Sequence, residues 1–264
     1  MIPPILLVGF GKMGGAMLAG WRERGLSPSI AIDPTAPDSP GAELTVLTDP
    51  AAIPPGFTPA AVVLAVKPQN AAQTLPQYQR FAGTAAYLSI MAGQTIRGMQ
   101  TLLGPQAAIV RAMPNTPAAI RQGFSVCSAG PGITPAQRDL CDQLLTAVGE
   151  VDWVEDESLL DPVTAVSGGG PAYVFLLAEL LEKAAIEQGI PAALARRMAR
   201  RTVAGSGALL AASDEDASKL RIAVTSPKGT TERALAVLMA PDACPALFSQ
   251  AIAEATARSR ELAG

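Results

Sequence analysis

Short apolar runs alternate with stretches of helix-forming residues throughout the first half of the chain. The apolar runs occupy residues 5–10, 29–33, 60–66, 85–91, 107–114 and 124–129. Helix formers fill the intervals near residues 13–24, 69–81, 95–103 and 135–147. The run AAVVLAV at 60–66 is apolar throughout, which is typical of a parallel strand covered on both faces. Strand and helix in alternation predict an α/β fold on a parallel sheet.

The second half changes character after about Asp156. From Pro171 onward, the pattern predicts helices near residues 171–189, 191–212, 214–223, 230–239 and 243–262. One polar stripe runs along the first of these helices: Glu179, Glu182, Lys183 and Glu187. Its other faces are apolar, so this helix belongs at the centre of a bundle or in a subunit interface. Between the second and third apolar runs, the Pro-rich stretch 34–59 predicts an irregular connection.

The 264 residues include no histidine, and this absence limits the chemistry. It excludes Ser-His-Asp and Cys-His catalysis as well as His-ligated metal sites. Any reaction must depend on a cofactor, carboxylates, Lys, Tyr, hydroxyls and backbone amides. The cysteines are odd in number, widely spaced and without a CxxC pair, so we expect reduced structural thiols and no metal site. They are Cys127, Cys141 and Cys244.

Charge and hydropathy argue against two classes of partner. The net charge of −3, without a basic run, makes nucleic acid an unexpected partner. No apolar stretch reaches the roughly 18 uninterrupted residues of a membrane-spanning helix, since charged residues interrupt 171–186. The N-terminal 18 residues have no cationic region and contain Lys12, so they do not read as a signal peptide. We expect a soluble, cytoplasmic protein with no membrane partner.

GFGKMG at residues 9–14 matches the pattern G-x-G-x-x-G. It directly follows an apolar run and opens a helical one, which is the context of a dinucleotide-binding turn. Gly9 would allow the tight turn, Gly11 would let the backbone approach a pyrophosphate, and Gly14 would permit close packing of helix on strand. An ordinary strand–helix turn is the alternative.

Asp33 lies 19 residues after Gly14, at the end of the second apolar run. The dinucleotide fingerprint places an acidic residue about 20 residues on, where it binds the ribose hydroxyls of NAD. A carboxylate there would repel the 2′-phosphate of NADP, so the sequence favours NADH. The alternative is that DPT is a plain turn signal.

Three further strand ends carry residues suited to a cofactor pocket. Ligands lie beyond the carboxyl ends of the strands in an open α/β sheet, so we expect Lys67, after the run at 60–66, to point toward the cofactor cleft. A solvated lysine at a helix start explains it equally well. SIMAGQT at 89–95 and RAMPNTP at 111–117 end strands in small and amide residues, which suit a nicotinamide pocket. Each of these two is alternatively a plain loop.

Two segments of the second half are rich in glycine and hydroxyl groups. VSGGGPAYVF at 166–175 places Ser167 and three glycines before a helix that begins with Pro171. We expect a flexible domain junction there, and a ligand role stays open. VTSPKGTTERAL at 224–235 leads into helix formers, and it predicts a helix cap, an anion site, or both.

Taken in order and spacing, six blocks resemble pyrroline-5-carboxylate reductase over nearly the whole chain. They are GFGKMGGAM, AVKPQ, SIMAG, RAMPNTP, DPVTAVSGGGPAYVF and VTSPKGTTERAL. The resemblance implies a Rossmann-type dinucleotide-binding domain over 1–158 and an all-α substrate and dimerisation domain over 159–264. It also implies NAD(P)H-dependent reduction of pyrroline-5-carboxylate to L-proline, the last step of proline synthesis. Homodimers that assemble further into rings are a third implication.

The resemblance assigns the site residue by residue. The cofactor pyrophosphate would be cradled by Gly9, Gly11, Lys12, Met13 and Gly14. The nicotinamide side would be lined by Ala65, Val66, Lys67 and Pro68, with Ala92 and Asn115 nearby. The substrate would be bound by the loop from Ser226 to Thr231, including Lys228, Gly229 and Thr230. Thr231 would face the ring nitrogen as the catalytic residue.

The chain departs from the family pattern at three positions. Gly169 stands where Ser is usual, Lys228 where Gly is usual, and Ala217 where Pro is common. The first two belong to the substrate neighbourhood, so the resemblance fixes the substrate less firmly than the fold. For Lys228 we weigh a charge near the substrate carboxylate against a solvated side chain, and favour the latter because Gly229 supplies flexibility.

The implied reaction suits a chain without histidine. A cyclic imine protonated on nitrogen is already electrophilic at carbon, so hydride transfer needs orientation more than a strong general acid. Another imine or hydroxyacid reductase is one alternative, although a hydroxyacid enzyme would need a poised acid or lysine. The helical half offers mainly Lys183, Lys219 and Lys228 for that purpose. A dinucleotide-binding regulatory protein without turnover is the other alternative.

Overall fold

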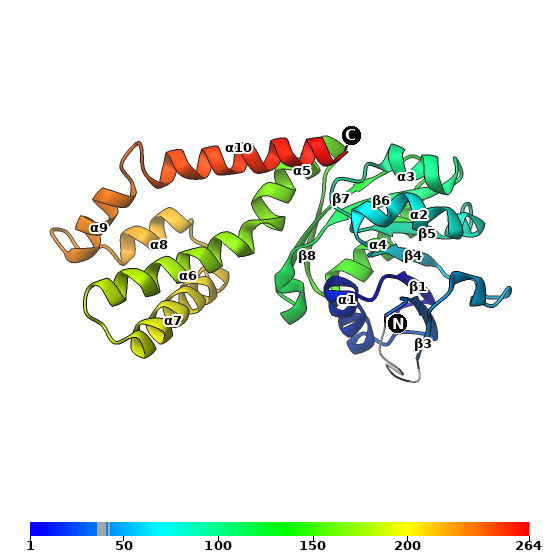
Figure 1. Cartoon of the computed structure of the whole chain (residues 1–264), viewed down its shortest axis with the longest axis horizontal. Coiled ribbons are helices and arrows are strands. Elements are labelled where there is room, and N and C mark those ends of the chain that lie inside the picture. Colours follow the sequence, from blue (N-terminus) through cyan, green and yellow to red (C-terminus); the bar gives the residue numbers. More distant parts are fainter. Residues whose placement is uncertain (36–40, 42, 264) are drawn as a thin grey trace. The chain divides into compact units, whose positions relative to one another are not determined.

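The computed structural model describes residues 1–35, 41 and 43–263. Within these residues, eight strands form one sheet in the order β3-β2-β1-β4-β5-β6-β7-β8. All neighbouring strands are parallel except β6 and β7, which are antiparallel (Figure 1). The strands are β1 Ile5–Val8, β2 Ser29–Ile32, β3 Leu44–Leu47, β4 Ala61–Leu64, β5 Ala86–Ser89, β6 Ala108–Met113, β7 Gly123–Ala129 and β8 Gly149–Trp153. The α/β prediction is therefore confirmed, with one antiparallel pair that it did not contain.

Helices follow or precede these strands. The α-helices of the first half are α1 Lys12–Glu23, α2 Ala71–Thr74, α3 Ile96–Leu103 and α4 Pro135–Thr146. Short 3-10 helices lie at η1 Pro50–Ala52, η2 Pro68–Asn70, η3 Leu75–Phe81, η4 Thr116–Ile120 and η5 Glu157–Leu159. Most of the helix predicted at 69–81 is thus 3-10 helix.

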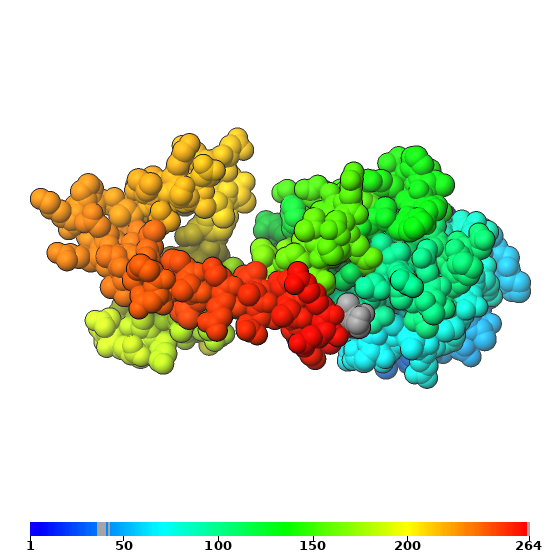
Figure 2. Space-filling view, turned by 90° about the horizontal axis from the view of Figure 1, so that it is seen from above, coloured from blue at the N-terminus to red at the C-terminus, as the bar shows by residue number. Residues whose placement is uncertain are grey.

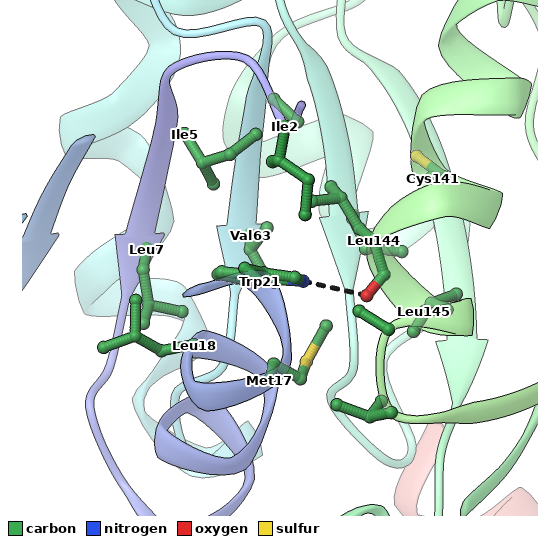
Figure 3. Packing of buried hydrophobic residues seen from close by; sticks show 14 of the residues in the cluster. Ile2, Ile5, Leu7, Met17, Leu18, Trp21, Val63, Cys141, Leu144 and Leu145 are labelled. Atoms are coloured by element: carbon green, nitrogen blue, oxygen red, sulfur yellow. Dashed lines mark hydrogen bonds between the residues drawn. The ribbon is translucent and has the colours of Figure 1, made fainter. Parts of the chain in front are cut away.

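The sheet carries a hydrophobic core on each face. Leu7 on β1 packs into the core that contains Met17 and Trp21 of α1, and its neighbour Leu6 packs into the opposite core with Tyr78 of η3. Trp21 donates from Nε1 to the main-chain oxygen of Leu144 on α4 at 2.8 Å, as Figure 3 shows. Both faces of the strands are therefore covered, as the continuous apolar run at 60–66 predicted for its own strand.

Three local predictions were wrong. The stretch 34–59 is not irregular throughout, because Leu44–Leu47 form the edge strand β3 beside β2. Pro37 and Pro40 of that stretch lie outside the described residues. Strand β8 was not predicted, because its sequence GEVDW alternates half-buried and exposed residues with little apolar content. The glycines of VSGGG lie at the junction between two compact units, as predicted, but they belong to helical turns instead of a flexible loop.

The rest of the chain is helical. It contains α5 Leu160–Val163, the π-helix η6 Thr164–Gly168, α6 Gly170–Glu187, α7 Ala192–Ala211, α8 Ala217–Ala223, α9 Thr230–Leu238 and α10 Cys244–Ala263. By internal contacts, one unit comprises Met1–Gly168 with the described residues from Ala255 on, and the other comprises Gly169–Glu254. We call these the sheet unit and the helical unit. The boundary predicted between residues 158 and 159 stays a prediction.

The helical unit has almost no buried interior of its own. Helix α6 has no buried residue, and α7 buries only Ala195 and Ala199. Phe175 on α6 is 63% exposed and Leu209 on α7 is 69% exposed. In the space-filling view of Figure 2, α10 (orange to red) is seen at the surface, and its Leu247 and Phe248 are exposed, whereas Thr256 and Ser259 near its end are buried. Apolar surface on this scale is typical of a protein–protein interface.

One helical stretch of the described residues, Glu157–Glu187, is long and apolar enough to cross a membrane by length and composition. It follows η5 through α5 and η6 into α6. The polar stripe of Glu179, Glu182 and Lys183 falls within this stretch. Length and composition do not by themselves separate a membrane span from a helix covered by another copy of the chain.

Candidate dinucleotide and substrate sites

The glycine loop between β1 and α1 is shaped by close backbone contacts. Gly9 has φ +94°, and an ideal Cβ built on it would lie 2.7 Å from the Ala65 carbonyl oxygen. A Cβ built on Gly14 would overlap the carbonyl oxygen of Gly9. Both positions therefore require glycine for reasons internal to the fold, as the sequence pattern predicted.

Gly11 is glycine without any such internal reason. A Cβ built on it meets no protein atom within 4 Å, and its φ of −74° is open to any residue. Gly11 also caps α1, whose first turn has no side-chain cap and no acidic residue. The first-turn amides of α1, which include those of Lys12 and Met13, have no partner within the helix, as an anion-binding helix start requires.

Asp33 follows β2 and contacts the glycine loop. Its Oδ2 accepts a 2.7 Å hydrogen bond from the backbone N–H of Phe10. Its Oδ1 accepts two 2.8 Å bonds from Thr35, one from the backbone and one from the hydroxyl. Partial burial raises the pKa of this carboxyl, but the hydrogen bonds from Thr35 and Phe10 outweigh burial and hold the pKa below its ordinary value. Asp33 is therefore an anion beside the loop at neutral pH.

The other predicted cofactor residues lie just beyond the carboxyl ends of neighbouring strands. Strands β1, β4, β5 and β6 are adjacent and parallel, so their carboxyl ends lie in a row. The register is continuous, because Leu64 pairs with both Val8 and Ser89. The residues that follow these ends include Gly9, Ala65, Val66, Lys67, Pro68, Ala92 and Asn115. Lys67, at the start of η2, is exposed, and Ala92 and Asn115 are half-buried.

Asn115 is held by hydrogen bonds at both ends of its amide. Its Oδ1 accepts from the backbone N–H of Phe124 at 2.9 Å. Its Nδ2 donates to Oγ of Ser167 at 3.2 Å. Ser167 lies in the π-helix η6, so this bond ties the end of β6 to the helical stretch that follows η5.

A buried ion-pair network lies behind the same strand ends, and the sequence pattern did not reveal it. Arg111 on β6 is 1% exposed, and its Nη1 lies 3.0 Å from Oε1 of Glu157. Its Nη2 lies 3.9 Å from Asp161, whose Oδ1 accepts a 2.7 Å bond from the Ser259 hydroxyl on α10. An arginine inside an apolar strand run was the available signal, since a buried guanidinium needs acidic partners.

Two of the three cysteines are core thiols. Burial raises the pKa of Cys141 to about 12, and burial is also the main cause that raises the pKa of Cys127. Neither thiol forms a useful thiolate at neutral pH. The three cysteines are unpaired, as the sequence predicted.

The loop before α9 forms a tight turn in the helical unit. The backbone N–H of Gly229 donates to the carbonyl of Ser226 at 3.0 Å, with Pro227 and Lys228 between them. Lys228 has φ +59°, which is the left-handed conformation that a type II turn requires at this place. Its backbone N–H donates to Oε2 of Glu232 at 2.8 Å.

The expected source of flexibility in this loop was wrong. Gly229 is extended, with φ −83°, and it is the Lys228 position that needs a left-handed residue. Gly229 is required instead for close approach, because a Cβ there would lie 2.9 Å from the Ser226 carbonyl oxygen. A family that usually has Gly at position 228 therefore has the residue that this turn favours.

The turn leads directly into a helix start. Gly229 caps α9 without a side-chain cap, and the first turn contains Thr230, Thr231 and Glu232. The N–H groups of these three residues have no partner within the helix. The cap and the anion-binding amides are thus the same feature, although the Gly229 N–H is already used by the turn. Thr231 is exposed in this unit.

Comparisons with known proteins find relatives and solved structures that match nearly the whole length of this chain. The family described as pyrroline-5-carboxylate reductase dimerisation matches residues 157–262. A pyrroline-5-carboxylate reductase of Pseudomonas aeruginosa is 37% identical, covering 99% of this chain and 97% of its own. Among solved structures, a pyrroline-5-carboxylate reductase from Coxiella burnetii has a TM-score of 0.88 at 28% identity, with both chains fully covered. That of Plasmodium falciparum, solved with NADP bound, has a TM-score of 0.85 at 23% identity, covering 99% of this chain and 98% of its own.

Proposed function

Since the chain belongs to the pyrroline-5-carboxylate reductase family, we propose that its glycine loop and strand ends hold the nicotinamide cofactor of that family's reaction. The protein reduces 1-pyrroline-5-carboxylate to L-proline, the last step of proline biosynthesis, with a nicotinamide dinucleotide. When bound, the reduced nicotinamide supplies the hydride for the imine carbon. The single observation that carries our assignment is Gly11, which leaves open space at the start of α1 where a ligand can approach the backbone.

The pyrophosphate is bound by backbone amides in this proposal. The loop from Gly9 to Gly14 offers the uncapped start of α1, where amide dipoles and the helix dipole favour an anion. Lys12 and Met13 supply the first of these amides. The nicotinamide side is lined by Ala65, Val66, Lys67 and Pro68, with Ala92 and Asn115 on the next two strands.

The cofactor in this proposal is preferentially NADH. Asp33 carries a negative charge beside the loop, and its lowered pKa keeps that charge at neutral pH. A 2′-phosphate on the adenine ribose would be repelled there, whereas ribose hydroxyls donate to a carboxylate. The ratio of kcat/KM with NADH to that with NADPH measures this preference.

The substrate carboxylate is bound at the start of α9 in this proposal. The N–H groups of Thr230 and Thr231 have no partner within the helix, and the Ser226–Gly229 turn fixes their position. Ser226 and Lys228 complete the loop. The Thr231 hydroxyl donates to the ring nitrogen as it becomes an amine, so no histidine is needed.

Thr231 is tested by removing its hydroxyl. Thr231→Ala is expected to lower kcat roughly 10-fold or more, as for the loss of one positioned polar group. Thr231→Ser should retain most of the rate. Thr225→Ala is the matched control, because that hydroxyl donates to the Arg221 carbonyl of α8 and lies outside the proposed site. Unchanged turnover in Thr231→Ala would remove Thr231 from the mechanism.

The family model that matches residues 157–262 describes a dimerisation domain, which supports self-association of this chain. We propose that a second copy covers the exposed apolar faces of α6 and α7, and that such dimers assemble further into rings. The same match supports a helical domain over 159–264, and we propose that the dinucleotide domain spans 1–158. In this proposal the enzyme is soluble and cytoplasmic, without a membrane or nucleic-acid partner, and the apolar helix at Glu157–Glu187 is covered by the second copy.

One assay separates this function from its alternatives. Purified protein should oxidise NADH when pyrroline-5-carboxylate is added, and the same measurement with NADPH gives the cofactor preference. A hydroxyacid reductase would oxidise NADH with an oxoacid but not with the cyclic imine. Binding of NADH without turnover on any of these substrates would indicate a regulatory protein.

A further inference from the structure

Ser167 differs from other helical hydroxyl groups in what its oxygen contacts. Thr101, Thr164 and Ser249 each donate to the main-chain carbonyl four residues earlier, as hydroxyls in helices commonly do. Ser167 instead accepts a hydrogen bond from Nδ2 of Asn115 at 3.2 Å. Among the residues that the structure describes, none is seen to accept the Ser167 hydroxyl proton.

The π-helix η6 produces this exception. Its wider turn follows an i to i+5 pattern, which removes Ser167 from the usual α-helical register. Gly168 packs on Met113 at the end of β6, since a Cβ on Gly168 would lie 3.6 Å from the Met113 sulfur. The same contact sets Ser167 beside Asn115, two residues beyond Met113. Short π-helical segments are frequent at functional sites.

The direction of the Asn115–Ser167 bond is fixed by a third residue. Oδ1 of Asn115 accepts from the backbone N–H of Phe124, so the opposite end of the amide must be the NH2 group. The NH2 group can only donate, and Ser167 Oγ is therefore the acceptor. The Ser167 proton remains for an acceptor outside the described protein, and Ser167 is only half-buried.

We propose that Ser167 donates its hydroxyl hydrogen bond to the carboxamide oxygen of the bound nicotinamide ring. The inference rests on the proposed function, which places the nicotinamide at the ends of β4, β5 and β6. The hydrogen bond to Asn115 holds Ser167 near the end of β6. The nicotinamide ring carries one neutral hydrogen-bond acceptor, its carboxamide oxygen. Ser167 is thus a cofactor-binding residue, and Asn115 is a positioning residue that acts through it.

A change in both the protein and the cofactor tests this bond. Calorimetry gives the Kd of Ser167→Ala and of the unaltered enzyme for NADH and for its thionicotinamide analogue, in which sulfur replaces the carboxamide oxygen. With NADH the variant should bind about 3- to 10-fold more weakly, the size of one hydrogen bond. With the analogue the loss should shrink to less than about 2-fold, because sulfur is a weak acceptor.

Equal weakening with both cofactors would overturn the proposal, since the loss would then be structural. An unchanged Kd for NADH, or a change confined to the KM for pyrroline-5-carboxylate, would also overturn it. Thr101→Ala is the matched control, an exposed helical hydroxyl of the sheet unit that should leave both Kd values unchanged. The titration needs no substrate, so lack of turnover by the unaltered enzyme would instead count against the proposed function.

A second variant tests the positioning role of Asn115. Asn115→Asp keeps an oxygen for the Phe124 N–H, while its other oxygen takes the Ser167 proton in place of donating to Ser167. It should weaken NADH binding like Ser167→Ala, and with the analogue the loss should again shrink. A loss of the same size with both cofactors would contradict positioning through Ser167.

Discussion

The backbone N–H of Phe10, inside the glycine loop, donates a 2.7 Å hydrogen bond to Oδ2 of Asp33 at the end of β2. This bond joins the two parts of the dinucleotide fingerprint, the loop and the acidic residue, in one contact. Thr35 occupies the other carboxylate oxygen from the following turn. Asp33 therefore shapes the loop as well as carrying charge, and substitutions there must separate the two effects.

Asp33→Asn is the substitution that removes charge at the lowest structural cost. Its remaining carbonyl oxygen can accept from Phe10 or from Thr35, and the repulsion of a 2′-phosphate disappears. We expect the ratio of kcat/KM with NADPH to that with NADH to rise by about 10-fold, or roughly 1.4 kcal/mol. Steady-state kinetics with both cofactors measure it.

Asp49→Asn is the control for this change. Asp49 also accepts a backbone bond with its carboxylate, from Ala51 at the start of η1, but it lies outside the fingerprint. The cofactor ratio of this variant should equal that of the unaltered enzyme. If Asp33→Asn also leaves the ratio unchanged, Asp33 does not select between the cofactors.

Gly11 and Gly14 of the fingerprint should respond differently to substitution by alanine. Gly11→Ala meets open space in the protein, so the apo protein should unfold at the same temperature while NADH affinity falls at least 10-fold. Gly14→Ala forces a Cβ against the Gly9 carbonyl, and a loss of about 2 kcal/mol or more of unfolding free energy is expected. Thermal unfolding without cofactor, together with calorimetric titration of NADH, distinguishes them. Unchanged affinity in Gly11→Ala would contradict the pyrophosphate site.

The sequence predicted those glycines because their requirement is local. Gly9 and Gly14 meet close backbone contacts and Gly11 is the ligand position of our proposal, all within six residues. Strand β8 escaped prediction because it is stabilised by pairing with the distant strand β7, and its own residues are half polar. Local pattern contains no information about such a pairing.

The contacts between buried or half-buried polar side chains could not be predicted from the sequence either. Arg111 and Glu157 lie 46 positions apart in sequence, and Asn115 and Ser167 lie 52 apart. Only the packing of η5 and η6 against β6 brings these pairs together. The turn at Ser226–Gly229 shows the opposite case, where the segment was recognised but the residue with positive φ was assigned incorrectly.

The exposed apolar face of α6 should be needed for self-association. Phe175→Glu places a charge on a side chain that is 63% exposed in one copy, and a second copy must desolvate that charge to bind. We expect the variant to dissociate toward monomers and to unfold at lower temperature, since the helical unit buries little by itself. Size-exclusion chromatography with light scattering measures the mass.

Glu182→Gln is the control on the same helix. Glu182 belongs to the polar stripe, and its neutral amide keeps the shape and the polarity. The mass of this variant should match that of the unaltered protein. A Phe175→Glu variant that keeps the full mass would show that this face of α6 is not the one covered.

Lys228→Gly should stabilise the protein, although it removes a charged side chain next to the proposed substrate loop. The left-handed φ of +59° disfavours lysine by about 1 kcal/mol, and glycine relieves this while adding some entropy to the unfolded chain. A net gain of about 0.5 kcal/mol in unfolding free energy is expected, at matched protein concentration because the protein self-associates. Lys228→Ala is the matched variant: it loses the same charge but keeps the disfavoured backbone, so it should gain nothing. Equal stability of the two variants would mean that backbone conformation is not the cause.

The KM of both variants for pyrroline-5-carboxylate, measured across a salt series, tests the charge of Lys228. A KM that rises at low salt in both variants would show that the ammonium group attracts the substrate carboxylate.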